Sequence, residues 1–157
     1  MRLTTKSRYG LRAMFDIAYQ CGSFPAQIQD ISRRQQISPR YLEQIFQHLK
    51  QAGILKSKRG PQGGYCLARK PSQITLLEII NATEQDIKMV DCVTSGQGGS
   101  PKEECSLKSR CVTQTIWEEA GNLLNSYFGS LTLQHLCERG QALGIAKEET
   151  HRFMYYI

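Results

Sequence analysis

The spacing of apolar residues after Ile37 predicts an amphipathic helix. Its apolar face consists of Leu42, Ile45, Phe46 and Leu49. These positions follow the i, i+3, i+4, i+7 spacing that brings side chains to one side of a helix. Ser38 is a favourable N-cap, and Pro39 suits the first helical position because no backbone N–H is needed there. Gly53 marks the expected end of the helix.

Two short strand-like runs follow this helix, ILKSKRG and GYCLAR, on either side of the turn residues 61–64. Their composition predicts a hairpin with Lys56, Lys58 and Arg59 at its tip and flank. The polar face of the preceding helix carries Arg40, Glu43, Gln44, Gln47 and Lys50. Several of these side chains can hydrogen-bond to base edges or phosphates. An amphipathic helix whose polar face can bind in a DNA groove, followed by a basic hairpin, predicts a winged helix-turn-helix.

The remaining apolar stripes predict helices over residues 5–21, 26–35, 75–82 and 112–130, and a short one through Leu133, Leu136 and Cys137 that ends at Gly140. Thr75 and Glu78 have the spacing of a capping box. The 112–130 helix carries an apolar band too wide for one partner, which indicates packing against a second copy. We therefore expect a mainly α chain with a small β-hairpin wing and a long dimerisation helix, divided at 1–83, 84–111 and 112–157.

Charge is distributed unevenly along the 157 residues. Residues 1–70 hold 13 Lys and Arg against 3 Asp and Glu, whereas residues 71–157 hold 7 against 11. A basic half joined to an acidic half is typical of a nucleic-acid-binding module confined to one part of a chain. The alternative, a solvated surface of lysines and arginines, predicts a more even distribution.

Several functional classes lack their sequence signals. No stretch approaches the roughly 20 apolar residues of a membrane span, and the polar N-terminus lacks the apolar region of a secretory signal, which predicts a cytoplasmic protein. His48, His135 and His151 have no neighbouring nucleophile, and no nucleotide-binding motif occurs. The chain is therefore not expected to be an enzyme.

Three cysteines in the glycine-rich stretch before the long helix are the sharpest chemical signal. Cys92, Cys105 and Cys111 have the spacing C-x12-C-x5-C. Three thiolates on one loop favour an iron–sulfur cluster. Zinc is the competing metal, although its sites usually contain a closely spaced cysteine pair, and loop cysteines without a ligand are the third interpretation. The other cysteines, Cys21, Cys66 and Cys137, are predicted to be small apolar side chains near the core.

The segments MRLTTKSRYGLRAM, ISPRYLEQIF and RGPQGGY, together with the three-cysteine loop, resemble the family of iron–sulfur regulators that includes IscR, NsrR, RirA and CymR. The resemblance covers nearly the whole chain. It implies a homodimeric transcription regulator bound to a double-stranded DNA operator, with the long helices crossing in the dimer. The matching positions imply helix contacts at Ser38, Arg40, Tyr41, Glu43 and Gln44, and wing contacts at Arg59 and Gly60.

The same resemblance implies a cluster held by the three cysteines, with 2Fe–2S favoured and 4Fe–4S as the alternative. The chain departs from its relatives at the fourth ligand. Gln114 stands where IscR has a histidine, and Arg8 where NsrR-like proteins have an acidic residue. Gln114, Glu103 or Glu104, or a small exogenous ligand, remain candidates.

The C-terminal FMYYI resembles the end of CymR, which carries no cluster and works with a metabolic enzyme. This favours, as an alternative, a cluster-free regulator controlled by such a partner through the tail, or by thiol oxidation. A third hypothesis is an electron-transfer or cluster-carrier protein, against which the basic helix argues.

Overall fold

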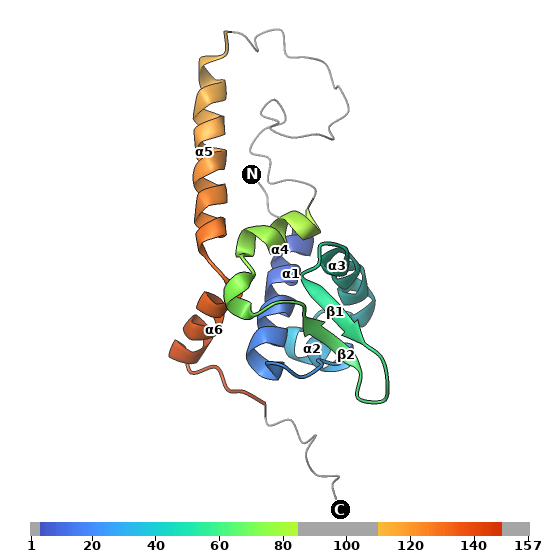
Figure 1. Cartoon of the computed structure of the whole chain (residues 1–157). Helices are drawn as coiled ribbons and strands as arrows, with labels where there is room; N and C mark the ends of the chain where they lie inside the picture. The colour runs from blue at the N-terminus through green and yellow to red at the C-terminus, as the bar shows by residue number, and fades with distance from the viewer. Residues whose placement is uncertain (1–3, 85–109, 149–157) are drawn as a thin grey trace, which may run out of the picture.

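The computed structural model describes residues 4–84 and 110–148. Most of the described chain is helical, and one antiparallel hairpin projects from it (Figure 1). The helices are α1 (Thr5–Asp16), α2 (Ile28–Gln35), α3 (Pro39–Gln51), α4 (Leu76–Thr83), α5 (Val112–Ser130) and α6 (Leu133–Ala142). The strands are β1 (Leu55–Lys58) and β2 (Gly64–Leu67), and the short turns are η1 (Ile17–Cys21, π-helical) and η2 (Pro71–Gln73, 3-10). The predicted fold class, a helical chain with a β-hairpin wing, is confirmed.

The core lies where α1, α2, α3 and α4 meet. Its largest fully buried side chains on these helices include Met14, Ile31, Phe46 and Ile79. All four residues of the predicted apolar face of α3 are fully buried. Burying such side chains stabilises the fold by about 1.5–3 kcal/mol each relative to leaving them in water. The helix-turn-helix is therefore built around the apolar stripe that the sequence predicted.

The helix starts are fixed by side-chain caps. The Ser38 hydroxyl accepts a hydrogen bond from the Tyr41 backbone N–H at 3.4 Å, directly before Pro39. The Thr75 hydroxyl accepts from the Glu78 N–H at 3.2 Å, and the Glu78 carboxylate accepts from the Thr75 N–H at 2.8 Å. Both predicted caps are confirmed. They satisfy backbone donors that a helix leaves open at its first turn.

The first helix covers the predicted residues 5–21, as α1 to Asp16 and as the π-helical turn η1 to Cys21. The predicted end of the last helix was wrong for a reason of packing. The last helix does not end at Gly140 but continues to Ala142, and Gly140 is buried against α1. A Cβ on Gly140 would lie 2.9 Å from the Phe15 ring, so glycine here permits the close approach of α6 to α1 rather than ending a helix.

The wing is anchored at its base to the segment before α2. Strands β1 and β2 pair in the register Leu55↔Leu67 to Lys58↔Gly64. Ala26 and Tyr65 exchange two backbone hydrogen bonds of 2.8 Å, which is why α2 begins at Ile28 and not at the predicted residue 26. A Cβ on Gly64 would collide with the Ala26 carbonyl, so this anchorage requires glycine. The wing is thereby tied to the helix-turn-helix itself.

Helix α5 extends away from the rest of the described chain (Figure 1). It contacts α4, where Leu77 approaches Gly129, and none of its residues is buried. Its start is separated from α4 by residues outside the described ranges. Within the described part of the chain, no helix is both long and apolar enough to cross a membrane.

Candidate nucleic-acid interface

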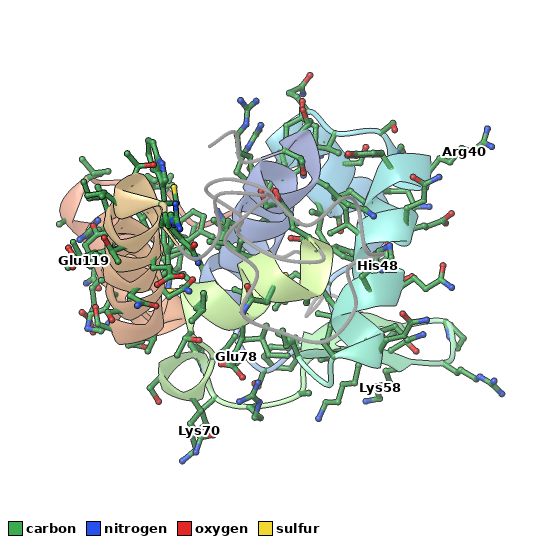
Figure 2. All side chains as sticks on the ribbon, turned by 90° about the horizontal axis from the view of Figure 1, so that it is seen from above. Arg40, His48, Lys58, Lys70, Glu78 and Glu119 are labelled. Carbon is green, nitrogen blue, oxygen red and sulfur yellow. The ribbon has the colours of Figure 1, made fainter. Side chains whose placement is uncertain are left out.

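The outer face of α3 is polar and open to solvent. Arg40, Glu43, Gln44, Gln47 and Lys50 are exposed, as is Ser38 at the N-cap, while Tyr41 is half-buried. Figure 2 shows Arg40 pointing away from the body of the molecule at one end of α3. Because the opposite face of α3 supplies the core, this arrangement leaves a row of long hydrogen-bonding side chains free to enter a groove. Of the helix residues predicted to contact DNA, four lie on this exposed surface, and Tyr41 lies half-buried at its edge.

The wing adds a basic surface beside α3. Lys56, Lys58, Arg59 and Gly60 are exposed, and Figure 2 shows Lys58 projecting outward beside the helix. Gly60 has a φ of 115°, and its carbonyl accepts a hydrogen bond from the Gly63 N–H at 2.8 Å to close the turn. This left-handed backbone favours glycine at the tip. Both predicted wing residues therefore lie at the exposed end of the hairpin.

The wing has a fixed position relative to α3. The Phe46 and Tyr65 rings pack with centroids 4.6 Å apart. Burial raises the pKa of the Tyr65 hydroxyl, and the negative charge of Glu43 raises it further. The carboxylate of Glu43, on the exposed face of α3, therefore interacts electrostatically with Tyr65 at the base of the wing. The sequence alone did not indicate this interaction.

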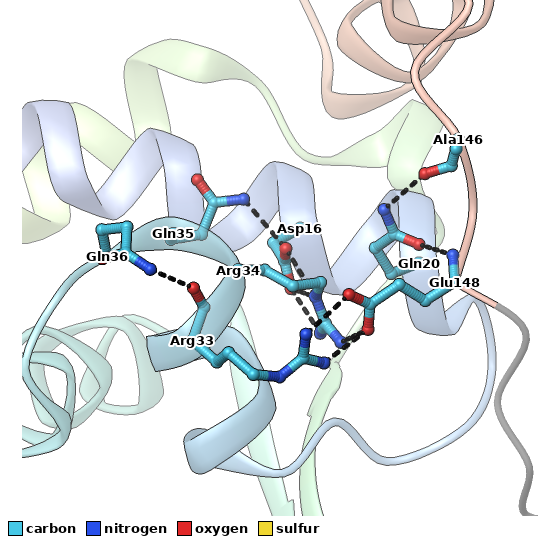
Figure 3. A network of polar contacts seen from close by, with 8 residues as sticks. All are labelled: Asp16, Gln20, Arg33, Arg34, Gln35, Gln36, Ala146 and Glu148. Carbon is cyan, nitrogen blue, oxygen red and sulfur yellow. Dashed lines mark hydrogen bonds and ion pairs between the residues drawn. The ribbon is translucent and has the colours of Figure 1, made fainter.

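The turn that leads into α3 is held by a buried polar network that sequence reasoning missed (Figure 3). The Asp16 carboxylate accepts hydrogen bonds from Arg34 at 2.7–3.1 Å and from the Gln35 side chain at 2.9 Å. Asp16 is 1% exposed. Burial opposes the charge on Arg34, but the hydrogen bonds and charge of Asp16 raise the pKa of its guanidinium overall. The network fixes the end of α2 against the end of α1.

The segment after α6 crosses back onto the helix-turn-helix (Figure 3). The Tyr19 hydroxyl donates to the Ile145 carbonyl at 2.8 Å, and the Gln20 side chain bonds both the Ala146 carbonyl and the Glu148 N–H. Arg33 donates two hydrogen bonds to the Glu148 carboxylate, at 2.6 and 2.9 Å. These bonds and those from Arg34 lower the pKa of Glu148 to about 2. These hydrogen bonds therefore hold residues 145–148, which follow α6, against η1 and α2.

One predicted metal ligand lies within the described residues. Cys111 is the N-cap of α5, and its sulfur lies 3.2 Å from the Thr113 hydroxyl oxygen. Hydrogen bonds from that hydroxyl and from the Gln114 backbone N–H lower the pKa of the thiol, which favours the thiolate that binds metals. Gln114 lies one turn later, and its amide nitrogen donates to Glu118 at 2.9 Å. Its carbonyl oxygen is thus the atom of this side chain suited to a metal.

Cys92, Cys105, Glu103 and Glu104 lie outside the described residues, as does the tail after residue 148. Among the residues that the structure does describe, no group of three or more metal-binding side chains comes together. The remaining cysteines were predicted to be small apolar side chains near the core, and their positions agree with this. Cys66 is buried, and Cys21 and Cys137 are partly buried against the core. Burial also raises the pKa of the Cys137 thiol, as expected for a packed apolar side chain.

Comparison with known proteins identifies the same family as the sequence motifs. Residues 3–139 match the family model of Rrf2, described as an iron-dependent transcriptional regulator. The transcriptional regulator IscR of Xenorhabdus nematophila is 38% identical over 95% of this chain and 87% of its own length, and that of an Escherichia coli strain is 36% identical over 96% and 90%.

Solved structures agree with this assignment. The structure of T. potens IscR is similar with a TM-score of 0.71 and 33% identity, covering 99% of this chain and 97% of that one. CymR, the global cysteine regulator of B. subtilis, is similar with a TM-score of 0.70 and 29% identity, covering 88% and 98%. The relatives are regulators rather than enzymes, as expected from the sequence. This chain belongs to the Rrf2 family of transcriptional regulators.

Proposed function

We propose that the chain is a homodimeric, DNA-binding regulator whose affinity for its operator is controlled by an iron–sulfur cluster. The observation that carries the proposal is the position of Cys111 at the N-cap of α5, the helix with the exposed apolar stripe. A ligand bound there would act directly on the start of the helix through which two copies would associate. We propose that this takes place in the cytoplasm, where the DNA is.

For DNA binding, α3 would enter a major groove and the wing an adjacent minor groove. Ser38, Arg40, Tyr41, Glu43 and Gln44 would contact base edges or phosphates from the helix, and Arg59 and Gly60 from the wing. The exposure of this row beside a basic hairpin supports the assignment. Glu43 would favour sites that offer a cytosine amino group, because a carboxylate near phosphates otherwise weakens binding.

For dimerisation, one side of α5 supplies an apolar stripe. Val112, Ile116, Leu123 and Tyr127 are 53–80% exposed. Their spacings of four, seven and four residues bring them to one face of the helix. Large apolar side chains at this spacing and exposure are typical of a helix that packs against a partner. A second copy crossing on this stripe would bury them.

For the cluster, Cys92, Cys105 and Cys111 would supply the thiolates, and residues 84–111 would form the binding loop. Gln114 is the candidate fourth ligand because it follows Cys111 by one turn of α5. A bound cluster would supply a redox-active and iron-dependent centre, with 2Fe–2S favoured over 4Fe–4S. The protein would transmit the signal through the conformation of the residues that lead into α5. That conformation would differ between the cluster-bound and the cluster-free protein.

The likeness to CymR supports a second candidate, a cluster-free regulator controlled by thiol oxidation or by a metabolic enzyme bound to the tail. The two proposals differ in what iron removal does. We would measure the affinity of anaerobically purified protein for a duplex selected by that protein from a random library, before and after chelation of its iron. A change of at least about tenfold, or 1.4 kcal/mol, supports cluster control. Equal affinity in both states, with DNA binding intact, favours the cluster-free regulator.

Removing the charge at the wing tip should weaken DNA binding. Arg59→Ala is expected to reduce affinity for the selected duplex by about tenfold or more, because a specific arginine–base contact is worth about 1–3 kcal/mol. It should also relax preference at minor-groove positions, where a narrow groove attracts arginine. Fluorescence anisotropy on the selected and base-substituted duplexes measures both effects. Gln62→Ala, at the neighbouring exposed turn position, is the matched control. An Arg59→Ala variant that binds every duplex like wild type would contradict the wing assignment.

A further inference from the structure

Helix α1 runs along one edge of the recognition helix and brings two cations to it. The Lys6 ammonium donates a hydrogen bond to His48 Nε2 of α3 at 3.0 Å. One helical turn further along α1, the Tyr9 ring packs edge-on against Tyr41 of α3, with centroids 5.8 Å apart. Tyr41 and His48 are separated by seven residues, or two turns, so they lie on the same edge of α3. Helix α1 therefore contacts this edge at two points that are two turns apart.

Arg12 continues the row beyond Tyr9. Its guanidinium lies over the Tyr9 ring, 5.3 Å from the centroid, and its Nε donates to the Gln35 side chain at 3.3 Å. A terminal nitrogen of Arg12 also donates to the Gln35 carbonyl at the end of α2. These contacts use two of the five guanidinium N–H groups. Arg12 is nevertheless exposed, so an oriented cation with free donors faces solvent beside the turn into α3.

The wing borders the other edge of α3. The Phe46 ring packs against the Tyr65 ring of β2, and the negative charge of Glu43 contributes to the raised pKa of the Tyr65 hydroxyl. The exposed row from Arg40 to Gln47 lies between the two edges. A helix inserted in a major groove about 12 Å wide has a phosphate backbone on each side. The wing cations suit one backbone, and the α1 cations are placed for the other.

The charge of the α1 edge is not neutralised within the described residues. Neither Lys6 nor Arg12 forms an ion pair there, whereas the nearby Asp16 carboxylate is occupied by Arg34 and Gln35. Cations without carboxylate partners, held by rings and amides, are free to pair with an anion. Phosphate oxygens are the anions that flank a groove-bound helix.

We propose that Lys6 and Arg12 bind phosphates of the DNA strand that borders α3 on the side opposite the wing. The Tyr9 ring packs against the Arg12 guanidinium and also contacts Tyr41 at the edge of α3. This inference rests on the proposed DNA-binding function and adds α1 as a second phosphate-contacting element. Because phosphates carry no base identity, these contacts would strengthen binding to every sequence and set the register of α3 in the groove.

The test is a salt titration of full-length protein on a short random-sequence duplex. Each phosphate contact contributes about 0.9 to the slope of log affinity against log salt concentration. Lys6→Gln and Arg12→Gln are each expected to reduce that slope by about 1 and to weaken binding about fivefold near physiological salt. Arg12→Lys, which retains the charge, should keep a slope close to that of wild type. Circular dichroism and melting temperature check the fold of each variant.

The matched control is Lys70→Gln, an exposed lysine that Figure 2 shows on the opposite side of the molecule from Arg40. It should leave slope and affinity unchanged. Lys6→Gln and Arg12→Gln variants that bind with the wild-type slope, whatever their stability, would overturn the inference while leaving the proposed function intact. A wild-type protein that binds no duplex at any salt concentration would refute the proposed function and the inference together.

Discussion

Asp16→Ala is expected to destabilise the folded chain by about 3–5 kcal/mol, because it leaves a largely buried guanidinium without its partner. The Arg34 side chain is 9% exposed, and Asp16 supplies three of its hydrogen bonds. The remaining bond to Glu148, at 3.2 Å, comes from a side chain that is 40% exposed. Urea or thermal denaturation measures the change in the free energy of unfolding.

The control for Asp16→Ala is Arg33→Ala, which removes an exposed partner of Glu148 and should change the free energy of unfolding little. Asp16→Asn should fall between the two, since the amide oxygen can still accept one hydrogen bond while the charge is lost. Where the Asp16→Ala variant remains folded, release of Gln35 at the turn into α3 should also weaken DNA binding. An Asp16→Ala variant as stable as Arg33→Ala would contradict the role assigned to this network.

Leu123→Glu is expected to convert a dimeric protein to monomers and to lower affinity for a duplex with two half-sites by about a hundredfold or more. A dimer gains this factor because its second half binds at a high effective concentration. Leu123 is 72% exposed in the single chain, so the substitution should leave the fold of each copy intact. Sedimentation analysis and fluorescence anisotropy measure the two effects.

The control for Leu123→Glu is Asn125→Glu, an equally acidic change at an exposed position two residues along α5 and outside the apolar stripe. It should leave association and DNA affinity near the wild-type values. If Leu123→Glu remained a dimer with full affinity, the apolar stripe of α5 would not be the dimer contact, and the proposed coupling between Cys111 and association would lose its basis.

The elements specified by local signals were predictable from the sequence. Helix α3 has a strong cap at Ser38, a proline at the first position and a complete apolar stripe, so its start and buried face were both correct. The wing was predictable because Gly63 and Gly64 follow Pro61 between two β-prone runs. Such signals act over one or two turns, within the range of spacing rules.

Contacts between distant residues were not predictable in the same way. Asp16 and Arg34 are 18 positions apart, and Arg33 and Glu148 are 115 apart, so no local periodicity links them. Gly140 followed the usual expectation for a helix end, yet its lack of a side chain serves packing against Phe15.

The candidate DNA surface was predicted more fully than its supports. The polar face of α3 and the basic residues of the wing were named from spacing and composition, and they are exposed as expected. Ser38, Tyr41 and Gly60 were added only through the family resemblance. The contribution of α1 was missed because Lys6, Tyr9 and Arg12 appear in sequence as part of an ordinary amphipathic helix. Only their contacts with His48, Tyr41 and Gln35 reveal that this side of α1 borders the recognition helix.

The central proposal, control by a cluster bound beside α5, is tested most directly by spectroscopy of anaerobically purified protein. Absorption and Mössbauer spectra would be recorded for wild type and for Cys92→Ala, Cys105→Ala and Cys111→Ala, with Cys66→Ala as the control at a buried cysteine. We predict a cluster in wild type and in the control, of the 2Fe–2S type, and its loss from each of the other three variants. A wild-type protein without iron, even after reconstitution, would contradict cluster control.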